Sequence, residues 1–272
     1  MPLYLPHFNL QNHNTLACPA LADFFVSVSS AEDLLNAIKF SREKKIPSMI
    51  LGGGSNIVLK SDFPGLVIHI GLLGKEVISD DGEYVYVKAA AGENWHEFVQ
   101  FCLDFHYWGL ENLSLIPGSV GAAPIQNIGA YGVELKDVFS ELSALDVQSG
   151  LSVTFTAEAC RFGYRDSVFK NELQDKYVIT SVTFKLQKQP QLKIRYPALE
   201  NALREYDHDS ITPELVSEVV SNIRQTKLPD PNFIPNAGSF FKNPIVAMAA
   251  LNAIKMNFPE VVFFPFDEGS VK

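Results

Sequence analysis

A glycine-rich segment at positions 116–132 constrains the fold of this chain more than any other feature of its sequence. The segment reads IPGSVGAAPIQNIGAYG and has the period of neither a helix nor a strand. Irregular connections of this length are uncommon in a compact domain and usually serve binding or catalysis. A mobile surface loop is the simpler interpretation, but the apolar residues Ile116, Val120, Ile125 and Ile128 favour burial instead.

Around this segment the pattern of apolar residues predicts short strands and segregated helices. Helices are predicted at residues 31–45, 93–105 and 213–224, the last with Thr212 as its N-cap. Because helices and strands do not alternate regularly, the predicted fold class is α+β rather than a regular βαβ sheet. The strands are predicted at residues 48–51, 57–59, 66–70, 84–89, 142–147, 152–155 and 178–185.

The composition argues against several classes of protein. The net charge of −9, from 22 basic and 31 acidic residues, offers no basic stripe for a nucleic acid. No apolar run is long enough to predict membrane insertion, and the N-terminal region lacks the pattern of a signal peptide. Three widely spaced cysteines predict no disulfide framework, which favours a cytoplasmic location. The six histidines lack metal-ligand spacing, so no metal site is predicted, and no feature predicts a protein partner.

A second glycine-rich turn lies at positions 52–56 between two predicted strands. Its three glycines allow backbone N–H groups to converge on an anion, and Ser55 and Asn56 add side-chain donors. A plain tight turn explains the same residues equally well. The turn is neither a dinucleotide-binding fingerprint nor a Walker loop, because it holds no G-x-G-x-x-G and no Gly-Lys-Ser/Thr.

Two further segments carry side chains that are suited to catalysis. Arg165, in the sequence GYRD, can hold a carboxylate through two parallel hydrogen bonds. Ser239, in the sequence NAGSFFKNP, can donate a proton to a nearby carbanion. Taken singly, an arginine beside an aspartate is more often a surface ion pair, and a serine after a glycine is usually a turn residue. Their joint order along the chain is what points to function.

That order resembles the UDP-N-acetylenolpyruvoylglucosamine reductase family along nearly the whole chain. Tyr196 and the full 185–226 region make the chain similar to the subgroup that includes the enterobacterial enzyme. The segments that carry the resemblance are LGGGSN (51–56), AGENWHEF (91–98), GLENLSLIPGSVGAAPIQNIGAYGVEL (109–135), CRFGYRDSVFK (160–170), TKLPDP (226–231) and NAGSFFKNP (236–244).

The resemblance implies an α+β, two-domain FAD-binding fold of the PCMH/vanillyl-alcohol-oxidase type, with an incomplete third, substrate-binding domain. The implied FAD-binding subdomains are residues 1–75 and 76–228, and the partial substrate-binding domain is 229–272. The FAD pyrophosphate is expected near 52–56 and the flavin near 116–132. The cofactor-binding residues so implied are Leu51, Gly52, Gly53, Gly54, Ser55, Asn56, Ile57, Ile116, Pro117, Gly118, Ser119, Gly121, Ala122, Ala123, Asn127, Ile128, Gly129 and Gly132.

The family chemistry implies that NADPH reduces FAD and that hydride then passes to UDP-N-acetylglucosamine enolpyruvate, giving UDP-N-acetylmuramate for peptidoglycan synthesis. FAD is thus the expected cofactor and NADPH the co-substrate. By position, Arg165 matches the arginine that holds the substrate carboxylate, and Ser239 matches the serine that protonates the α-carbon. The substrate-binding residues implied are Tyr131, Tyr196, Lys227 and Asn243.

The chain departs from the family pattern at its C-terminus. The family continues past Lys272 and carries there a catalytic glutamate that nothing in this sequence matches. The chain is therefore expected to be truncated, and a FAD-binding fragment with little or no turnover is the alternative function. A related flavin oxidase of the same fold is a third hypothesis. The TKLPDP and NAGSFFKNP segments argue against it, as does the lack of a histidine or cysteine that matches a covalent flavin attachment.

Overall fold

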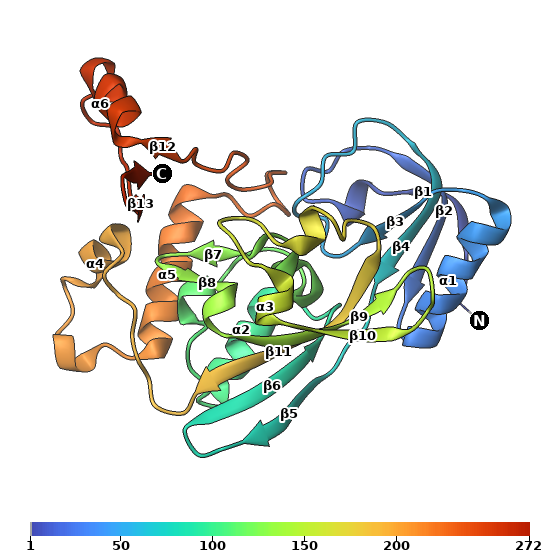
Figure 1. Cartoon of the computed structure of the whole chain (residues 1–272), viewed down its shortest axis with the longest axis horizontal. Coiled ribbons are helices and arrows are strands. Elements are labelled where there is room, and N and C mark those ends of the chain that lie inside the picture. The colour runs from blue at the N-terminus through green and yellow to red at the C-terminus, as the bar shows by residue number, and fades with distance from the viewer. Residues whose placement is uncertain (1) are drawn as a thin grey trace. The chain divides into compact units, whose positions relative to one another are not determined.

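The computed structural model describes residues 2–272, and the chain forms two compact units. The units are Met1–Ala237 and Gly238–Lys272. Most strands of the first unit belong to two sheets, one built from the N-terminal residues and one from the middle of the chain (Figure 1). No helix within residues 2–272 is long and apolar enough to cross a membrane.

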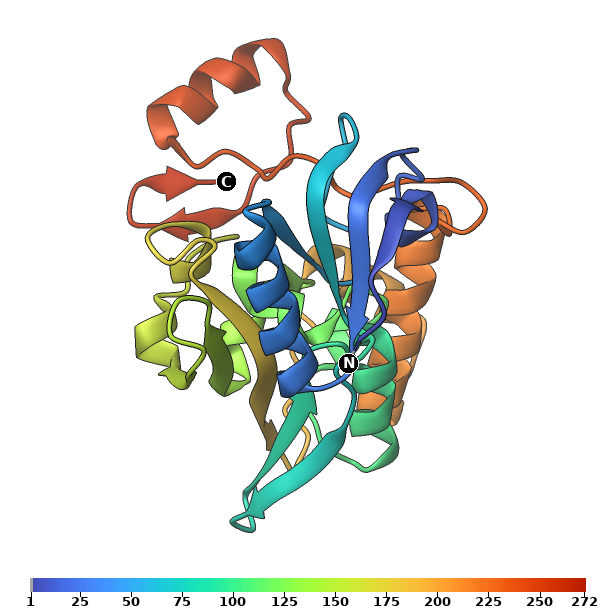
Figure 2. The same ribbon diagram turned by 90° about the vertical axis from the view of Figure 1, so that its right-hand side faces the viewer.

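The N-terminal sheet has four strands in the order β1-β2-β4-β3. β1 (Leu5–Asn9) pairs antiparallel with β2 (Leu21–Val28). β4 (Phe63–Ile70) pairs in parallel with both β2 and β3 (Ser48–Leu51). Helix α1 (Ala31–Lys44) connects β2 to β3, and its apolar face packs on β2 and β4 (Figure 2). The helix predicted in this region is confirmed.

The second sheet has five antiparallel strands in the order β10-β9-β11-β6-β5. Every second residue of β6 is buried, as expected for a strand with one face on a core. The mixture of this antiparallel sheet with separate helices confirms the α+β class. Its strands are β5 (Lys75–Asp80), β6 (Tyr84–Ala90), β9 (Phe139–Asp146), β10 (Ser152–Thr156) and β11 (Tyr177–Gln187).

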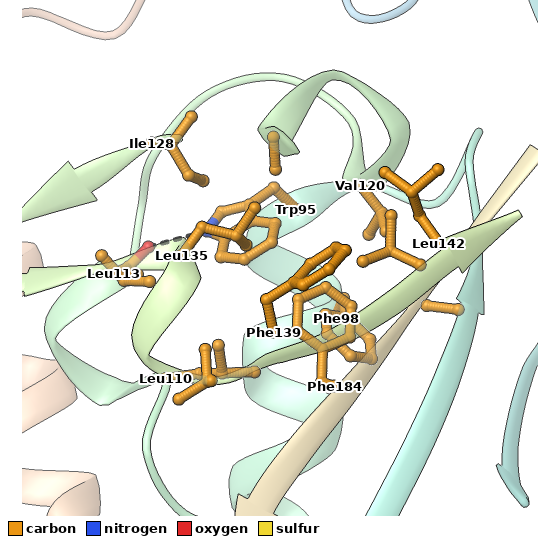
Figure 3. Close-up of a cluster of buried hydrophobic side chains, with 14 of the residues drawn as sticks. Trp95, Phe98, Leu110, Leu113, Val120, Ile128, Leu135, Phe139, Leu142 and Phe184 are labelled. Carbon is orange, nitrogen blue, oxygen red and sulfur yellow. Dashed lines mark hydrogen bonds between the residues drawn. The ribbon is translucent and has the colours of Figure 1, made fainter. Parts of the chain in front are cut away.

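Helix α2 (Trp95–Asp104) supplies the aromatic centre of the core beside the second sheet (Figure 3). The Phe184 ring of β11 lies 4.7 Å from the Phe98 ring and 5.9 Å from the Trp95 ring, measured between centroids. The Trp95 indole N–H donates to the Leu113 carbonyl at 2.8 Å, so its polar atom is satisfied inside the core.

Phe184→Ala is expected to lower the free energy of unfolding by about 3–5 kcal/mol, because Phe184 is fully buried among aromatic rings and its removal leaves a cavity. Urea denaturation followed by circular dichroism measures the loss. Phe105→Ala is the matched control, since that ring is 56% exposed and its removal is expected to cost no more than about 1 kcal/mol. Equal losses in the two variants would contradict this account of the core.

The remaining helices of the first unit follow the two sheets. α3 (Ala157–Cys160) and α4 (Pro197–Leu203) are short, and α5 (Pro213–Lys227) is the longest. The Thr212 hydroxyl accepts from the Leu215 N–H at 3.3 Å, which confirms the predicted N-cap of α5. Short 3-10 helices are η1 (Gln11–His13), η2 (Glu111–Leu113), η3 (Val120–Gln126), η4 (Leu135–Asp137), η5 (Val168–Lys170) and η6 (His208–Ser210).

The 116–132 segment is more regular than its sequence predicts. It contains η3, and β7 (Gly129–Ala130) pairs with β8 (Val133–Glu134) just after it. Its isoleucines and valine are buried or half-buried against the core, so the preference for burial is confirmed. The strand predicted at residues 57–59 is wrong: these residues have no regular structure, because no strand of the described chain pairs with them.

The second unit is small and contains β12 (Val246–Ala247), α6 (Met248–Asn257), β13 (Pro265–Asp267) and β14 (Ser270–Val271). The strands form an antiparallel sheet in the order β12-β14-β13. Many of its large apolar side chains, including several phenylalanines, are exposed.

Candidate active site

The 52–56 loop follows β3 and is built around a left-handed backbone at Gly54. The φ angle of Gly54 is +64°, and a Cβ there would lie 2.1 Å from the His13 carbonyl oxygen, so only glycine fits. The Thr15 N–H holds the loop by donating to the Gly54 carbonyl at 3.1 Å. Within residues 2–272, no hydrogen bond engages the N–H groups of Gly53 or Gly54, which leaves both free to bind an anion.

The two glycine-rich segments lie against each other beside a cavity. The Ser55 hydroxyl donates to the Pro117 carbonyl at 3.1 Å. A cavity of about 460 Å³ is lined by Gly52 from the first segment and by Ser119 and Ala122 from the second. Most of the remaining wall comes from α1, from strands of both sheets, and from η5 with the loop that follows it. A cavity lined by strands of two sheets, next to a loop with free N–H groups, suits an extended ligand that carries phosphates.

Thr15 is a candidate site residue that the sequence reasoning did not single out. Its Oγ1 is buried and has no hydrogen-bond partner within residues 2–272. A buried hydroxyl without a partner is costly, so a ligand that accepts from it would be favoured. Because the Thr15 N–H already contacts Gly54, this hydroxyl lies at the same loop. Together the loop, the hydroxyl and the cavity fit the pyrophosphate of FAD.

Arg165 lies against the 116–132 segment. Its Nη2 donates to the Gly129 carbonyl at 2.5 Å, and its guanidinium lies 5.4 Å from the centre of the Tyr164 ring. The Arg165 backbone is left-handed, with φ of +54°, a conformation that a residue with a Cβ rarely adopts. No carboxylate within residues 2–272 pairs with this guanidinium, so its charge is available to an anionic ligand.

Asn127 joins the 116–132 segment to the turn that carries Arg165. It is fully buried, and its Nδ2 donates to the Gly163 carbonyl at 2.9 Å and to Glu134 Oε2 at 3.0 Å. Its Oδ1 accepts from the Lys136 N–H at 3.0 Å. These bonds use both ends of the amide, so Asn127 fixes the turn in place against the segment.

Gly129→Ala is expected to lower kcat/KM by about 10²-fold through displacement of Arg165. A Cβ at position 129 would lie 2.9 Å from Arg165 Nη1 and 2.9 Å from the Val133 carbonyl oxygen, so the guanidinium has to move. Steady-state kinetics of the FAD-loaded chain measure the loss, and far-ultraviolet circular dichroism checks that the variant is folded. Wild-type kcat/KM in this variant would show that the Gly129 contact does not place the guanidinium.

Two of the predicted substrate-binding residues lie together in the first unit. The rings of Tyr131 and Tyr196 meet edge to face, with centroids 5.4 Å apart. Burial raises the pKa of both phenols, so both hydroxyls are proton donors at neutral pH. Asn112 Nδ2 donates to the Tyr131 backbone carbonyl at 2.8 Å and so helps to hold Tyr131 in place. Lys227 is the exposed last residue of α5.

Other predicted residues lie outside this group. Ser239 and Asn243 are exposed residues of the second unit, in the stretch before β12. Their joint action with Arg165 therefore stays a prediction. Leu51 and Ile128 are buried in hydrophobic clusters of the first unit, where they hold the glycine-rich segments in place.

Comparison with known proteins supports a FAD site in this chain. Residues 22–156 match a family model described as an FAD binding domain. The chain is 45% identical over 267 residues to the UDP-N-acetylenolpyruvoylglucosamine reductase of Flavobacterium johnsoniae, covering 98% of this chain and 79% of that protein. It is 47% identical over 260 residues to the reductase of the same name from Bdellovibrio bacteriovorus, covering 96% of this chain and 77% of that protein.

Solved structures show the same relationship. The crystal structure of UDP-N-acetylenolpyruvylglucosamine reductase from Thermus caldophilus superposes with a TM-score of 0.63 at 25% identity, covering 90% of this chain and 75% of that chain. Cholesterol oxidase from B. sterolicum superposes with a TM-score of 0.50 at 13% identity, covering 68% of this chain and 38% of that chain, and shares the fold alone. The fold is thus the FAD-binding fold of the PCMH/vanillyl-alcohol-oxidase type, and the chain is a FAD-dependent oxidoreductase. Because it is 45–47% identical to these reductases over 96–98% of its own length and 77–79% of theirs, the chain belongs to the UDP-N-acetylenolpyruvoylglucosamine reductase family.

Proposed function

We propose that this chain catalyses the NADPH-dependent, FAD-mediated reduction of UDP-N-acetylglucosamine enolpyruvate to UDP-N-acetylmuramate, a step of peptidoglycan synthesis. The observation that carries the proposal is the Arg165 guanidinium, which lies on the 116–132 segment with no carboxylate partner in the described chain. Such a group suits a substrate whose own carboxylate lies next to the reacting carbons. The reductases among the relatives supply the substrate class.

In this proposal the residues of the chain bind the substrate, stabilise the negative charge that develops on it and supply a proton. FAD, when bound, carries a hydride from NADPH to the β-carbon of the enolpyruvyl group. Arg165 holds the substrate carboxylate and stabilises the negative charge that spreads onto it. Ser239 donates a proton to the α-carbon and regains one from water. The C=C bond gains a hydride and a proton, and NADPH leaves as NADP⁺, so electrons and atoms balance.

We also propose where the cofactor lies and how the chain is organised. The free N–H groups and the Thr15 hydroxyl support a pyrophosphate at the 52–56 loop. The flavin is assigned to the 116–132 segment, where Arg165 is held. We propose the division into residues 1–75, 76–228 and 229–272. The first boundary is supported by the sheets, because the N-terminal sheet ends with β4 and the next begins with β5 at Lys75, and the third part contains the compact unit Gly238–Lys272. The three cysteines are free, which supports the cytoplasm as the location.

A second candidate function is FAD binding with little or no turnover. The observation that favours it is the make-up of the second unit, in which the rings of Phe240, Phe241 and Phe258 are 65%, 85% and 66% exposed. A unit this small, with so much exposed apolar surface, has little core to hold Ser239 in a catalytic position.

A steady-state assay tests the proposed reaction. Purified chain loaded with FAD is incubated with NADPH and the enolpyruvyl UDP-sugar, and the product is analysed by mass spectrometry. The proposal requires NADPH oxidation that depends on the sugar, and a product heavier than the substrate by two hydrogens. NADPH oxidation that ignores the sugar, with the sugar recovered unchanged, would reject the reaction for this chain.

A further inference from the structure

Leu115 adopts a backbone conformation that its own side chain disfavours. Its φ angle is +57°, in the left-handed region that residues with a Cβ rarely occupy. It lies between Ser114, which is fully buried after η2, and the 116–132 segment. The direction in which the chain enters that segment is therefore set at Leu115, and the surrounding structure has to hold it there.

Two side chains from different helices hold the two polar backbone groups of Leu115. The Leu115 N–H donates to Nδ1 of His96, on α2, at 3.0 Å. The Leu115 carbonyl accepts from Nε of Arg224, on α5, at 3.1 Å. Both side chains are half-buried. We call the three residues the Leu115 clamp.

The two helices that carry the clamp, α2 and α5, both pack against η2. Ser114 Oγ and Ser217 Oγ, the latter on α5, are 2.7 Å apart in a buried hydrogen bond. Gln100 of α2 donates to the same Ser217 hydroxyl at 3.2 Å. The indole N–H of Trp95, next to His96 in the chain, donates to the Leu113 carbonyl. The two side chains of the clamp are therefore carried by helices that are hydrogen-bonded to each other and to η2, and not by a surface loop.

Burial is the main reason why the His96 ring favours its neutral form. Burial lowers the pKa of His96 below its ordinary 6.5, Arg224 lowers it further, and Glu97 on its own helix acts in the opposite direction. A neutral ring with its proton on Nε2 has a lone pair on Nδ1 and can accept from Leu115. The Arg224 guanidinium also acts electrostatically on Tyr131, at the far end of the 116–132 segment.

We propose that His96 and Arg224 are positioning residues for the cofactor. By fixing Leu115 in its left-handed conformation, they set the place of the 116–132 segment against the flavin. This inference rests on the proposed function, because it takes that segment as the flavin site. Neither residue contacts the reacting atoms; each acts through Leu115.

The clamp makes cofactor binding depend on pH in a defined direction. Because the pKa of His96 is depressed, the ring is neutral above pH 6.5 and the clamp is intact there. As the pH falls through the lowered pKa, Nδ1 gains a proton and can no longer accept from the Leu115 N–H. The affinity for FAD is then expected to fall about tenfold, the scale of one lost hydrogen bond to a buried N–H group.

Three variants test the clamp through FAD titrations between about pH 8 and pH 5. His96→Asn keeps an uncharged acceptor near the position of Nδ1, so its affinity for FAD is expected to match wild type at high pH and to stay level as the pH falls. His96→Phe keeps a ring without an acceptor, and its affinity is expected to be about tenfold weaker at every pH. His69→Gln is the matched control, since it removes another half-buried histidine, one bonded to Ser27, and should keep the wild-type fall.

The visible absorption bands of bound flavin and the far-ultraviolet circular dichroism are recorded with each titration. The bands of His96→Phe are expected to shift while the circular dichroism stays that of the wild type. Three results would each overturn the clamp. The affinity of His96→Asn could fall with pH as in the wild type, His96→Phe could bind FAD with wild-type affinity, or the affinity of the wild type could be independent of pH. Failure of the wild-type chain to bind FAD at any pH would instead refute the cofactor half of the proposed function.

Discussion

Ser239→Ala is expected to leave NADPH reduction of the bound flavin unchanged and to slow reoxidation by the enolpyruvyl UDP-sugar by about 10²–10⁴-fold. This range is the usual contribution of a positioned proton donor. Reduction of the flavin by NADPH does not use the serine, so the loss is expected only in reoxidation of the flavin by the sugar. Stopped-flow absorbance under anaerobic conditions measures the two halves separately.

Ser239→Cys is the matched control for this prediction. A thiol of similar size can also donate a proton, so this variant is expected to reoxidise faster than the alanine variant. Undiminished reoxidation in Ser239→Ala would remove the serine from the mechanism. Slowed reduction by NADPH in the same variant would show that Ser239 acts on the cofactor site rather than on the substrate.

Arg165→Met is expected to lower kcat/KM for the sugar by about 10²–10³-fold, the usual loss when one preorganised donor to a developing charge is removed. Within residues 2–272 the guanidinium donates one hydrogen bond, from Nη2 to Gly129, so its removal leaves a single carbonyl to be satisfied. Steady-state kinetics at several sugar concentrations separate the effects on kcat and on KM.

Arg165→Lys tests whether the two parallel hydrogen bonds of the guanidinium contribute in addition to its charge. Lysine keeps the charge but cannot form two parallel hydrogen bonds to a carboxylate, so an intermediate kcat/KM is expected. Affinity for FAD in both variants is expected to equal that of the wild type. A methionine variant with wild-type kcat/KM would show that Arg165 is structural, and a methionine variant that loses FAD would reassign it to the cofactor.

Local periodicity predicted the elements that have one clear apolar face. Helix α1 was found because its buried residues repeat with the period of a helix, and β6 because its residues alternate between buried and half-buried. β3 and β11 were found from their apolar runs, since their burial does not alternate. The apolar triplet at 57–59 carries the same local signal, but a strand needs a partner, and none lies beside it. β1 and β5 were missed, because their exposed, mixed patterns take their strand form from pairing.

The candidate site was predictable to a different extent at each residue. The resemblance implied Arg165 and both glycine-rich segments. In the structure, Gly129 and Asn127 join the 116–132 segment to the turn of Arg165, and Ser55 joins the 52–56 loop to Pro117. His96, Leu115 and Arg224 come together only through the packing of two helices on η2, which no local pattern encodes. The sequence did contain one indication of Arg224: it lies three residues before Lys227, a predicted substrate-binding residue, and therefore on the same side of α5.

The most direct test of the central claim is an anaerobic visible spectrum of the FAD-loaded chain, recorded before NADPH, after NADPH, and after the enolpyruvyl UDP-sugar. The account predicts that NADPH bleaches the flavin absorbance and that the sugar restores it without oxygen, because both half-reactions then occur on this chain. Bleaching with no recovery on addition of the sugar would contradict the proposed reaction and support FAD binding without turnover.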